Sequence, residues 1–109
     1  TYRDAGRYYG EQRGDLNRAV QYLEQARQLR PDDYETLRLL GVAYGIGGDQ
    51  ERAISFFNRA AELAPDNADA WFNLATAHLN AGNAIRAEEY LQRAKALDPG
   101  IVERRRREN

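Results

Sequence analysis

The feature that most constrains this chain is a repeat with a period of 34 residues. When the sequence is shifted by this period, five kinds of residue coincide in three successive copies. The aligned sets are Gly14, Gly48 and Gly82; Asp15, Asp49 and Asn83; Arg18, Arg52 and Arg86; Ala19, Ala53 and Ala87; and Pro31, Pro65 and Pro99. Such periodicity indicates one structural unit that is copied and stacked, because each unit buries its apolar face only against its neighbours.

The second copy shows the content of one unit most clearly. Leu37, Leu40 and Tyr44 recur at the spacing of one helical face, which predicts an amphipathic helix. The glycine pair at 47–48 ends this helix, because glycine adopts the left-handed conformation without steric cost. Asp49 then stands where an N-cap carboxylate can accept a hydrogen bond from a free amide of the next helix.

A second helix follows in the same unit. Ala53, Phe57 and Ala60 lie on one of its faces, and the two small alanines allow a close approach to the first helix. Pro65 ends the second helix, and the next helix is predicted to begin near Ala68.

The first copy contains one additional residue. Its first helix aligns best through Tyr2 and Tyr9, one residue out of step with the later copies. The additional residue lies between Tyr9 and Gly14. We therefore expect a longer or looser turn around residues 10–13.

The pattern resembles the tetratricopeptide repeat (TPR). The second copy matches through Leu37, Leu40, Gly41, Tyr44, Gly48, Ala53, Phe57, Ala60 and Pro65, and the third through Trp71, Leu74, Ala75, His78, Gly82, Ala87, Leu91, Ala94 and Pro99. The match covers about residues 2–99 and implies an all-α, right-handed solenoid of three helix-turn-helix repeats with a short C-terminal helical tail. We expect a single domain over residues 1–109, with repeats at about 1–33, 34–67 and 68–101 and the tail at 102–109.

Composition excludes several classes of function. The chain has no cysteine, which removes disulfides, thiol catalysis and thiolate metal sites, and its formal net charge of −1 provides no field to steer a polyanion. No apolar run approaches the roughly 18 residues of a membrane span, and we expect a soluble protein. The sequence does not determine the compartment, although we favour the cytoplasm. Because the chain opens at Thr1 inside a helical pattern, we expect it to be a fragment of a longer protein.

Catalytic and cofactor sites are not indicated. His78 is the only histidine, and it occupies the repeat position of Tyr44, so we interpret it as a packed residue. Ser55 is the only serine, and no serine, histidine and carboxylate trio can be proposed around it. The glycine-rich segment 45–48 ends a helix and lacks the lysine of a phosphate-binding loop. Metal-ligand spacing is absent as well, so we predict a protein that is not an enzyme and that uses no cofactor or metal.

The resemblance implies that the first helices of the repeats line a concave surface, whose variable positions contact an extended or helical peptide. Carried over to this sequence, the predicted groove consists of Arg3, Arg7, Arg38, Leu39, Val42, Ile46, Phe72, Asn73, Thr76, Leu79 and Asn80. Phe72 is the strongest candidate, because its neighbour Trp71 already occupies the core position. The alternatives are a solvating role for the arginines and packing between repeats for Val42 and Ile46.

Single residues distinguish two peptide-binding modes of the family. Repeats that clamp the carboxylate terminus of heat-shock chaperones carry asparagine and lysine at positions where this chain has Leu39 and Asp69. An aspartate repels a carboxylate, so the comparison argues against this clamp. Asn73 matches a second mode, in which a side-chain amide pairs with the backbone of a bound peptide.

The C-terminal segment is expected to cover the open end of the third repeat. Ile101 and Val102 supply apolar side chains, and residues 103–109 are interpreted as a solvated helical end or a frayed tail. Four consecutive arginines raise the alternative of a nucleic-acid contact. We do not favour it, because the run is short and flanked by glutamates.

We therefore expect a protein-interaction scaffold that binds a peptide segment of a partner in its concave groove. Two alternatives stay open: self-association into a homo-oligomer through the ends of the stack, and a regulatory arm of a larger enzyme. The expected partner is a protein or peptide, and neither a small-molecule substrate nor a nucleic acid is predicted. The sequence does not identify the partner or the process.

Overall fold

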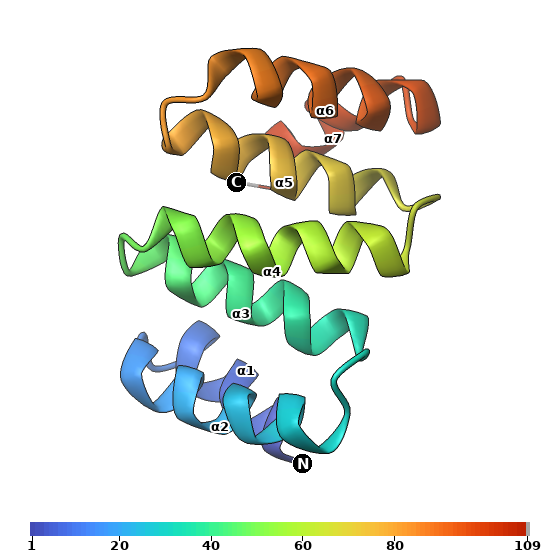
Figure 1. The fold of residues 1–109 in the computed structure, drawn as a ribbon. Coiled ribbons are helices and arrows are strands. Elements are labelled where there is room, and N and C mark those ends of the chain that lie inside the picture. The colour runs from blue at the N-terminus through green and yellow to red at the C-terminus, as the bar shows by residue number, and fades with distance from the viewer. Residues whose placement is uncertain (109) are drawn as a thin grey trace.

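The computed structural model describes residues 1–108, which form seven α-helices and no strand. The helices are α1 (Tyr2–Glu11), α2 (Leu16–Leu29), α3 (Tyr34–Ile46), α4 (Gln50–Leu63), α5 (Ala68–Asn80), α6 (Ala84–Leu97) and α7 (Ile101–Arg107). Figure 1 shows three helix pairs stacked in chain order, with α7 beside the last pair. The predicted all-α solenoid is confirmed, and Asn109 of the predicted tail lies outside the described residues.

Local hydrogen bonds set the helix ends where the sequence predicts them. The Asp49 carboxylate accepts a hydrogen bond of 3.0 Å from the Arg52 amide and so caps α4. Asn67 caps α5 in the same way, because its side-chain oxygen accepts from the Asp69 amide at 3.0 Å. Gly48 has a φ of +91°, which glycine adopts without strain, and it reverses the chain between α3 and α4.

The first turn is longer than the other two, as the sequence predicts. Residues 12–15 separate α1 from α2, whereas residues 47–49 separate α3 from α4. The additional residue is therefore absorbed in the loop, and the helices keep their registers.

A stacked pair of rings joins the two helices of every repeat. The pairs, with the distances between ring centres, are Tyr9 and Tyr22 at 5.5 Å, Tyr44 and Phe56 at 5.6 Å, and His78 and Tyr90 at 5.4 Å. His78 is buried, which confirms its interpretation as a packed residue. Burial lowers the pKa of His78, and the nearby Arg86 charge adds to this effect, so the ring is neutral near neutral pH.

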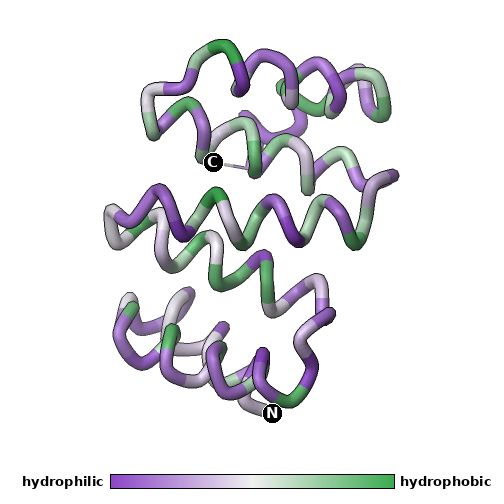
Figure 2. Tube along the Cα trace, viewed as in Figure 1, coloured by the Kyte–Doolittle hydropathy of each residue, from purple (hydrophilic) through white to green (hydrophobic). Residues whose placement is uncertain are grey.

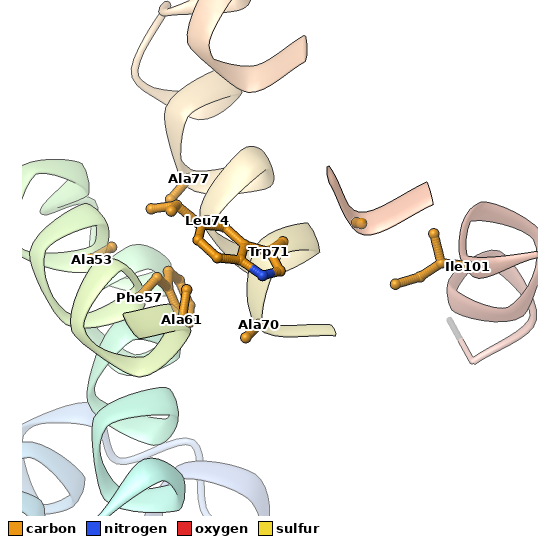
Figure 3. Close-up of a cluster of buried hydrophobic side chains, with 9 residues drawn as sticks. Ala53, Phe57, Ala61, Ala70, Trp71, Leu74, Ala77 and Ile101 are labelled. Atoms are coloured by element: carbon orange, nitrogen blue, oxygen red, sulfur yellow. The ribbon is translucent and has the colours of Figure 1, made fainter. Parts of the chain in front are cut away.

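The main core lies between the second and third repeats. Figure 3 shows Phe57 and Ala61 of α4 facing Trp71 and Leu74 of α5. Ile101 at the start of α7 is fully buried in the same cluster, which confirms that the C-terminal segment covers the third repeat.

The helices are amphipathic. Hydrophobic and hydrophilic residues alternate along them, as Figure 2 shows. Over residues 1–108, no helix combines the length and the apolar character that crossing a bilayer requires.

Candidate peptide-binding groove

A groove of about 660 Å³ lies between α3 and α5, closed at one end by α7. We call it the α3–α5 groove. Its lining residues are Gly41, Val42, Gly45 and Ile46 of α3; Gln50 and Phe57 of α4; Phe72, Asn73, Thr76, Ala77 and Asn80 of α5; and Val102, Arg105 and Arg106 of α7.

The groove combines apolar walls with amide groups. Val42, Ile46 and Phe72 supply the larger apolar side chains, and Ile46 is 69% exposed. Gln50 and Asn80 place side-chain amides at the same surface. Among the described residues that line the groove, none carries a carboxylate. Such a surface can bury apolar side chains of a ligand and form hydrogen bonds with its backbone.

The structure brings together six of the eleven residues that the sequence predicts for the groove. These six are Val42, Ile46, Phe72, Asn73, Thr76 and Asn80. They come from α3 and α5 alone, so the groove is formed by the second and third repeats and does not extend across the first.

The three predicted arginines do not line the α3–α5 groove, and each is paired within the chain. Arg7 and Arg38 line a smaller cavity of about 190 Å³ between α1 and α3, which shares Val42 and Ile46 with the groove. Arg3 of α1 donates to the carboxylate of Asp33, the N-cap of α3, at 3.2 Å. Arg7 and Arg38 both donate to Glu35. These side chains join α1 to α3 and do not line the α3–α5 groove.

Glu35 is the centre of this arginine cluster. The hydrogen bond from Arg38 lowers the pKa of Glu35, and the hydrogen bond from Arg7 adds to it, so the two outweigh the opposing effect of burial. The carboxylate is therefore charged at neutral pH, and its two guanidinium partners are held at the boundary between the repeats.

The structure corrects the placement of two predicted apolar residues. Leu39 is only 6% exposed and packs in the core with Ala19 and Leu23 of α2. Leu39 therefore does not line the α3–α5 groove; its small exposed part lies at the cavity between α1 and α3. Leu79 is 60% exposed, but it lines a separate cavity between α5 and α6 with Leu91.

At the closed end of the groove, the Arg105 side chain of α7 covers α5. Its Nη1 donates to Asp69 Oδ1 at 2.9 Å, and its Nη2 donates to Asn73 Oδ1 at 2.8 Å. The guanidinium carbon also lies 4.7 Å from the centre of the Phe72 ring. Two residues that the sequence predicts to contact a partner, Phe72 and Asn73, are therefore contacted by the chain itself.

Arg104 adds a second guanidinium to this end of the groove. It donates to Asp69 Oδ2 and to Asp98, both at 3.1 Å. Burial raises the pKa of Asp69, but the hydrogen bonds from Arg104 and Arg105 outweigh it, so the pKa of Asp69 is lowered below its ordinary value. The interpretation of residues 103–109 as solvated is corrected for these two arginines.

Arg105 is a groove residue that the sequence did not lead us to expect. A shift of 34 places Arg105 at the position of Leu37 and Trp71, and both of these are buried. This alignment could have indicated that Arg105 packs inward, because an arginine at a core position of a repeat faces the preceding unit and not solvent. The run of four arginines concealed it, since such a run usually indicates a solvated surface.

The described part of the chain offers no metal centre. Within residues 1–108, no group of three or more His, Cys, Asp or Glu side chains is arranged to hold a metal ion.

Comparisons with known proteins agree on one family. Two family models described as tetratricopeptide repeat match residues 3–68 and residues 47–103. No curated protein sequence matches the chain.

Solved structures of several repeat proteins share the fold. The crystal structure of MamA superimposes with a TM-score of 0.88 at 24% identity, over 94% of this chain and 59% of MamA. YrrB, described as a TPR protein with an unusual peptide-binding site, superimposes with a TM-score of 0.84 at 26% identity, over 90% of this chain and 50% of YrrB. An O-GlcNAc transferase from Thermobaculum terrenum superimposes with a TM-score of 0.81 at 26% identity, over 90% of this chain and 19% of the enzyme. The chain thus spans less than two thirds of each of these proteins.

Proposed function

Because the chain belongs to the tetratricopeptide repeat family, we propose that it is a non-catalytic scaffold that binds a segment of a protein partner in the α3–α5 groove. The likeness to YrrB, whose description includes a peptide-binding site, supports a peptide as the ligand. A partner segment is the ligand for which the groove is large enough and chemically suited.

The observation that carries this proposal is the composition of the groove wall. Val42, Ile46 and Phe72 expose apolar surface in a concave site, and water is a poor solvent for such surface. Burial of an apolar side chain of the ligand stabilises the complex by roughly 25 cal/mol per Å² before the losses of freedom on binding are subtracted. The Asn80 amide and the side-chain oxygen of Gln50, whose Nε2 donates to the Gly45 carbonyl at 3.1 Å, then orient the ligand backbone.

The test uses two exposed isoleucines, one that lines the groove and one that does not. Ile46 is 69% exposed inside the groove, and Ile85 is 80% exposed at the start of α6, outside it. Ile46→Asp places an uncompensated charge where the ligand is expected, whereas Ile85→Asp places the same charge outside the groove. Partners captured by the full chain are compared for the two variants by quantitative affinity capture.

We expect Ile46→Asp to reduce capture of a specific partner at least about tenfold, and Ile85→Asp to leave it unchanged. Circular dichroism of both variants shows whether the helices are intact. Equal capture by the two variants would place the ligand outside the α3–α5 groove.

Self-association is a second candidate function, and the cavity between α5 and α6 favours it. Leu79 and Leu91 line this cavity of about 300 Å³, which α7 leaves open. A second copy that packs on this end face buries Leu79, which is 60% exposed in the single chain. Sedimentation at micromolar concentration then detects a dimer that Leu79→Asp dissolves, and a monomer at every concentration rules the dimer out.

A third hypothesis places these repeats in a larger enzyme. The chain is similar to 19% of an O-GlcNAc transferase, which supports the idea that such repeats can form part of an enzyme. Under this hypothesis the groove selects a substrate protein, and the full-length sequence is the observation that decides it.

A further inference from the structure

One turn of α5 presents three electron-rich groups to a single guanidinium. They are the Asp69 carboxylate, the side-chain oxygen of Asn73 and the face of the Phe72 ring. Arg105 contacts all three at once, with hydrogen bonds of 2.9 Å and 2.8 Å and a distance of 4.7 Å from its central carbon to the ring centre.

These contacts select a guanidinium over an ammonium. The planar fork of arginine directs two N–H groups at two separate acceptors while its flat face stacks on an aromatic ring. A lysine ammonium is a point charge and cannot make the parallel hydrogen bonds and the stacking together. The arrangement is therefore a binding site for an arginine side chain, and not only a negative patch.

The segment that fills the site is held to the stack by few contacts. Helix α7 has seven residues, and a helix of this length is not stable in water by itself. Ile101 is its one fully buried side chain among the described residues. Both arginines that bind Asp69 are partly exposed, and ion pairs of this kind each contribute little to stability. Release of α7 thus belongs to the low-energy local openings of the molecule.

Release of α7 leaves the Asp69 carboxylate without a cationic partner. Arg104 and Arg105 both leave Asp69, so a carboxylate next to the closed end of the groove loses its counter-charges. Any segment that takes the place of α7 restores the lost interactions only if it brings a cation to this point. The Phe72 ring and the Asn73 oxygen favour the same kind of group.

We propose that Asp69, Phe72 and Asn73 form an arginine-binding site that Arg105 fills in the free protein, and that a partner segment carrying an arginine replaces it. The role in partner binding rests on the proposed function of the α3–α5 groove, because the site forms the closed end of that groove. Helix α7 then acts as a competitor within the chain, and its displacement links partner binding to the exposure of residues 101–107.

A titration with blocked arginine, N-acetyl-arginine methylamide, tests the site directly by NMR. The signal observed is the side-chain amide of Asn73 in the full chain. We expect Arg105→Ala to bind the probe at least about tenfold more tightly than the unmodified chain, because the competing side chain is removed. Blocked lysine should give no saturable shift in the same variant.

Two further variants complete the experiment. Adding Asp69→Asn to Arg105→Ala should abolish the response, and Arg107→Ala, an exposed neighbour on α7, should behave as the unmodified chain. Equal affinity in Arg105→Ala and the unmodified chain, or equal affinity for blocked lysine, would overturn the proposal. If Arg105→Ala does not fold, the proposal is tested in the unmodified chain by hydrogen exchange of the α7 amides. Blocked arginine should accelerate this exchange, because it displaces Arg105 from the site. The titration needs no partner. Its failure would therefore count against the arginine site alone, whereas equal partner capture by Ile46→Asp would count against the proposed function of the groove.

Discussion

The guanidinium of Arg105 lies 4.7 Å from the centre of the Phe72 ring, on the face of α5 that the sequence predicts to contact a partner. The same side chain donates to Asn73 at 2.8 Å. One element thus serves as the cap of the helix stack and as the end wall of the groove. Any ligand that reaches Phe72 and Asn73 together has to compete with it.

Arg105→Ala should loosen α7 without unfolding the repeats. The variant loses an ion pair and a ring contact, each of which contributes up to about 1 kcal/mol at a partly exposed site. We therefore expect hydrogen exchange of the α7 amides to accelerate about 5- to 30-fold, while the amides of α3 to α6 keep their protection. Arg107→Ala is the matched control on the same helix, and equal acceleration in it would mean that α7 frays regardless of Arg105.

Docking of α7 should depend on pH through Asp69. Its pKa is lowered from the ordinary value of 3.8, so the charged carboxylate stabilises the folded arrangement above that value. This contribution is lost as the pH falls below 3.8 and through the lowered pKa, because the protonated acid is a poorer partner for two guanidinium groups.

The measurement is an NMR titration of the Asp69 carboxyl carbon. Removing both partners, by Arg104→Ala with Arg105→Ala, leaves only the effect of burial, so the pKa of Asp69 should rise. An unchanged Asp69 pKa in the double variant would show that the two arginines do not stabilise the carboxylate.

A pair of glycine substitutions tests how closely α3 and α4 approach. A Cβ added at Gly41 lies 2.6 Å from Cε1 of Phe57, which forces the ring to move, whereas one added at Gly45 lies 3.6 Å from the Ala53 Cβ, an ordinary contact. We expect Gly41→Ala to destabilise the fold by about 1–3 kcal/mol through overpacking. Gly45→Ala should stabilise it by roughly 0.5–1 kcal/mol, since alanine favours a helix. Urea unfolding measures both, and equal effects would contradict the close approach.

His78→Tyr restores the residue that the first two repeats carry at this position. The pKa of His78 in the folded chain lies below its ordinary value of 6.5. As the pH falls, His78 is therefore protonated in the unfolded chain before it is protonated in the folded one. The free energy of unfolding should therefore decrease below about pH 6.5 in the natural chain, and His78→Tyr should remove this part of the decrease.

The comparison needs urea unfolding at about pH 7.5 and about pH 5, where carboxylates contribute little to the difference. Stacking on Tyr90, with ring centres 5.4 Å apart, should be retained by the tyrosine. An identical pH dependence in the two chains would show that His78 is not protonated differently on folding.

Much of the fold follows from the sequence, because its determinants are local. Asp49 caps α4 through an amide three residues away, and Gly48 reverses the chain by its own φ of +91°. The positions of Val42 and Phe72 at the groove follow as well, since the repeat register assigns them to first helices. The burial of Leu39 did not follow from the register, because α3 contacts a helix on each side and both Leu39 and Leu40 pack against α2.

The sequence by itself determined the 34-residue repeat, the three helix pairs and the packed role of His78. Only the tertiary structure decided which charged side chains are paired with one another. Arg3 meets Asp33 and Arg105 meets Asp69 across separations of 30 and 36 residues. Helix propensity and periodicity report interactions within a few residues along the chain. A charge pair between stacked repeats instead depends on how side chains from two units meet in space, and this is fixed only when the units pack.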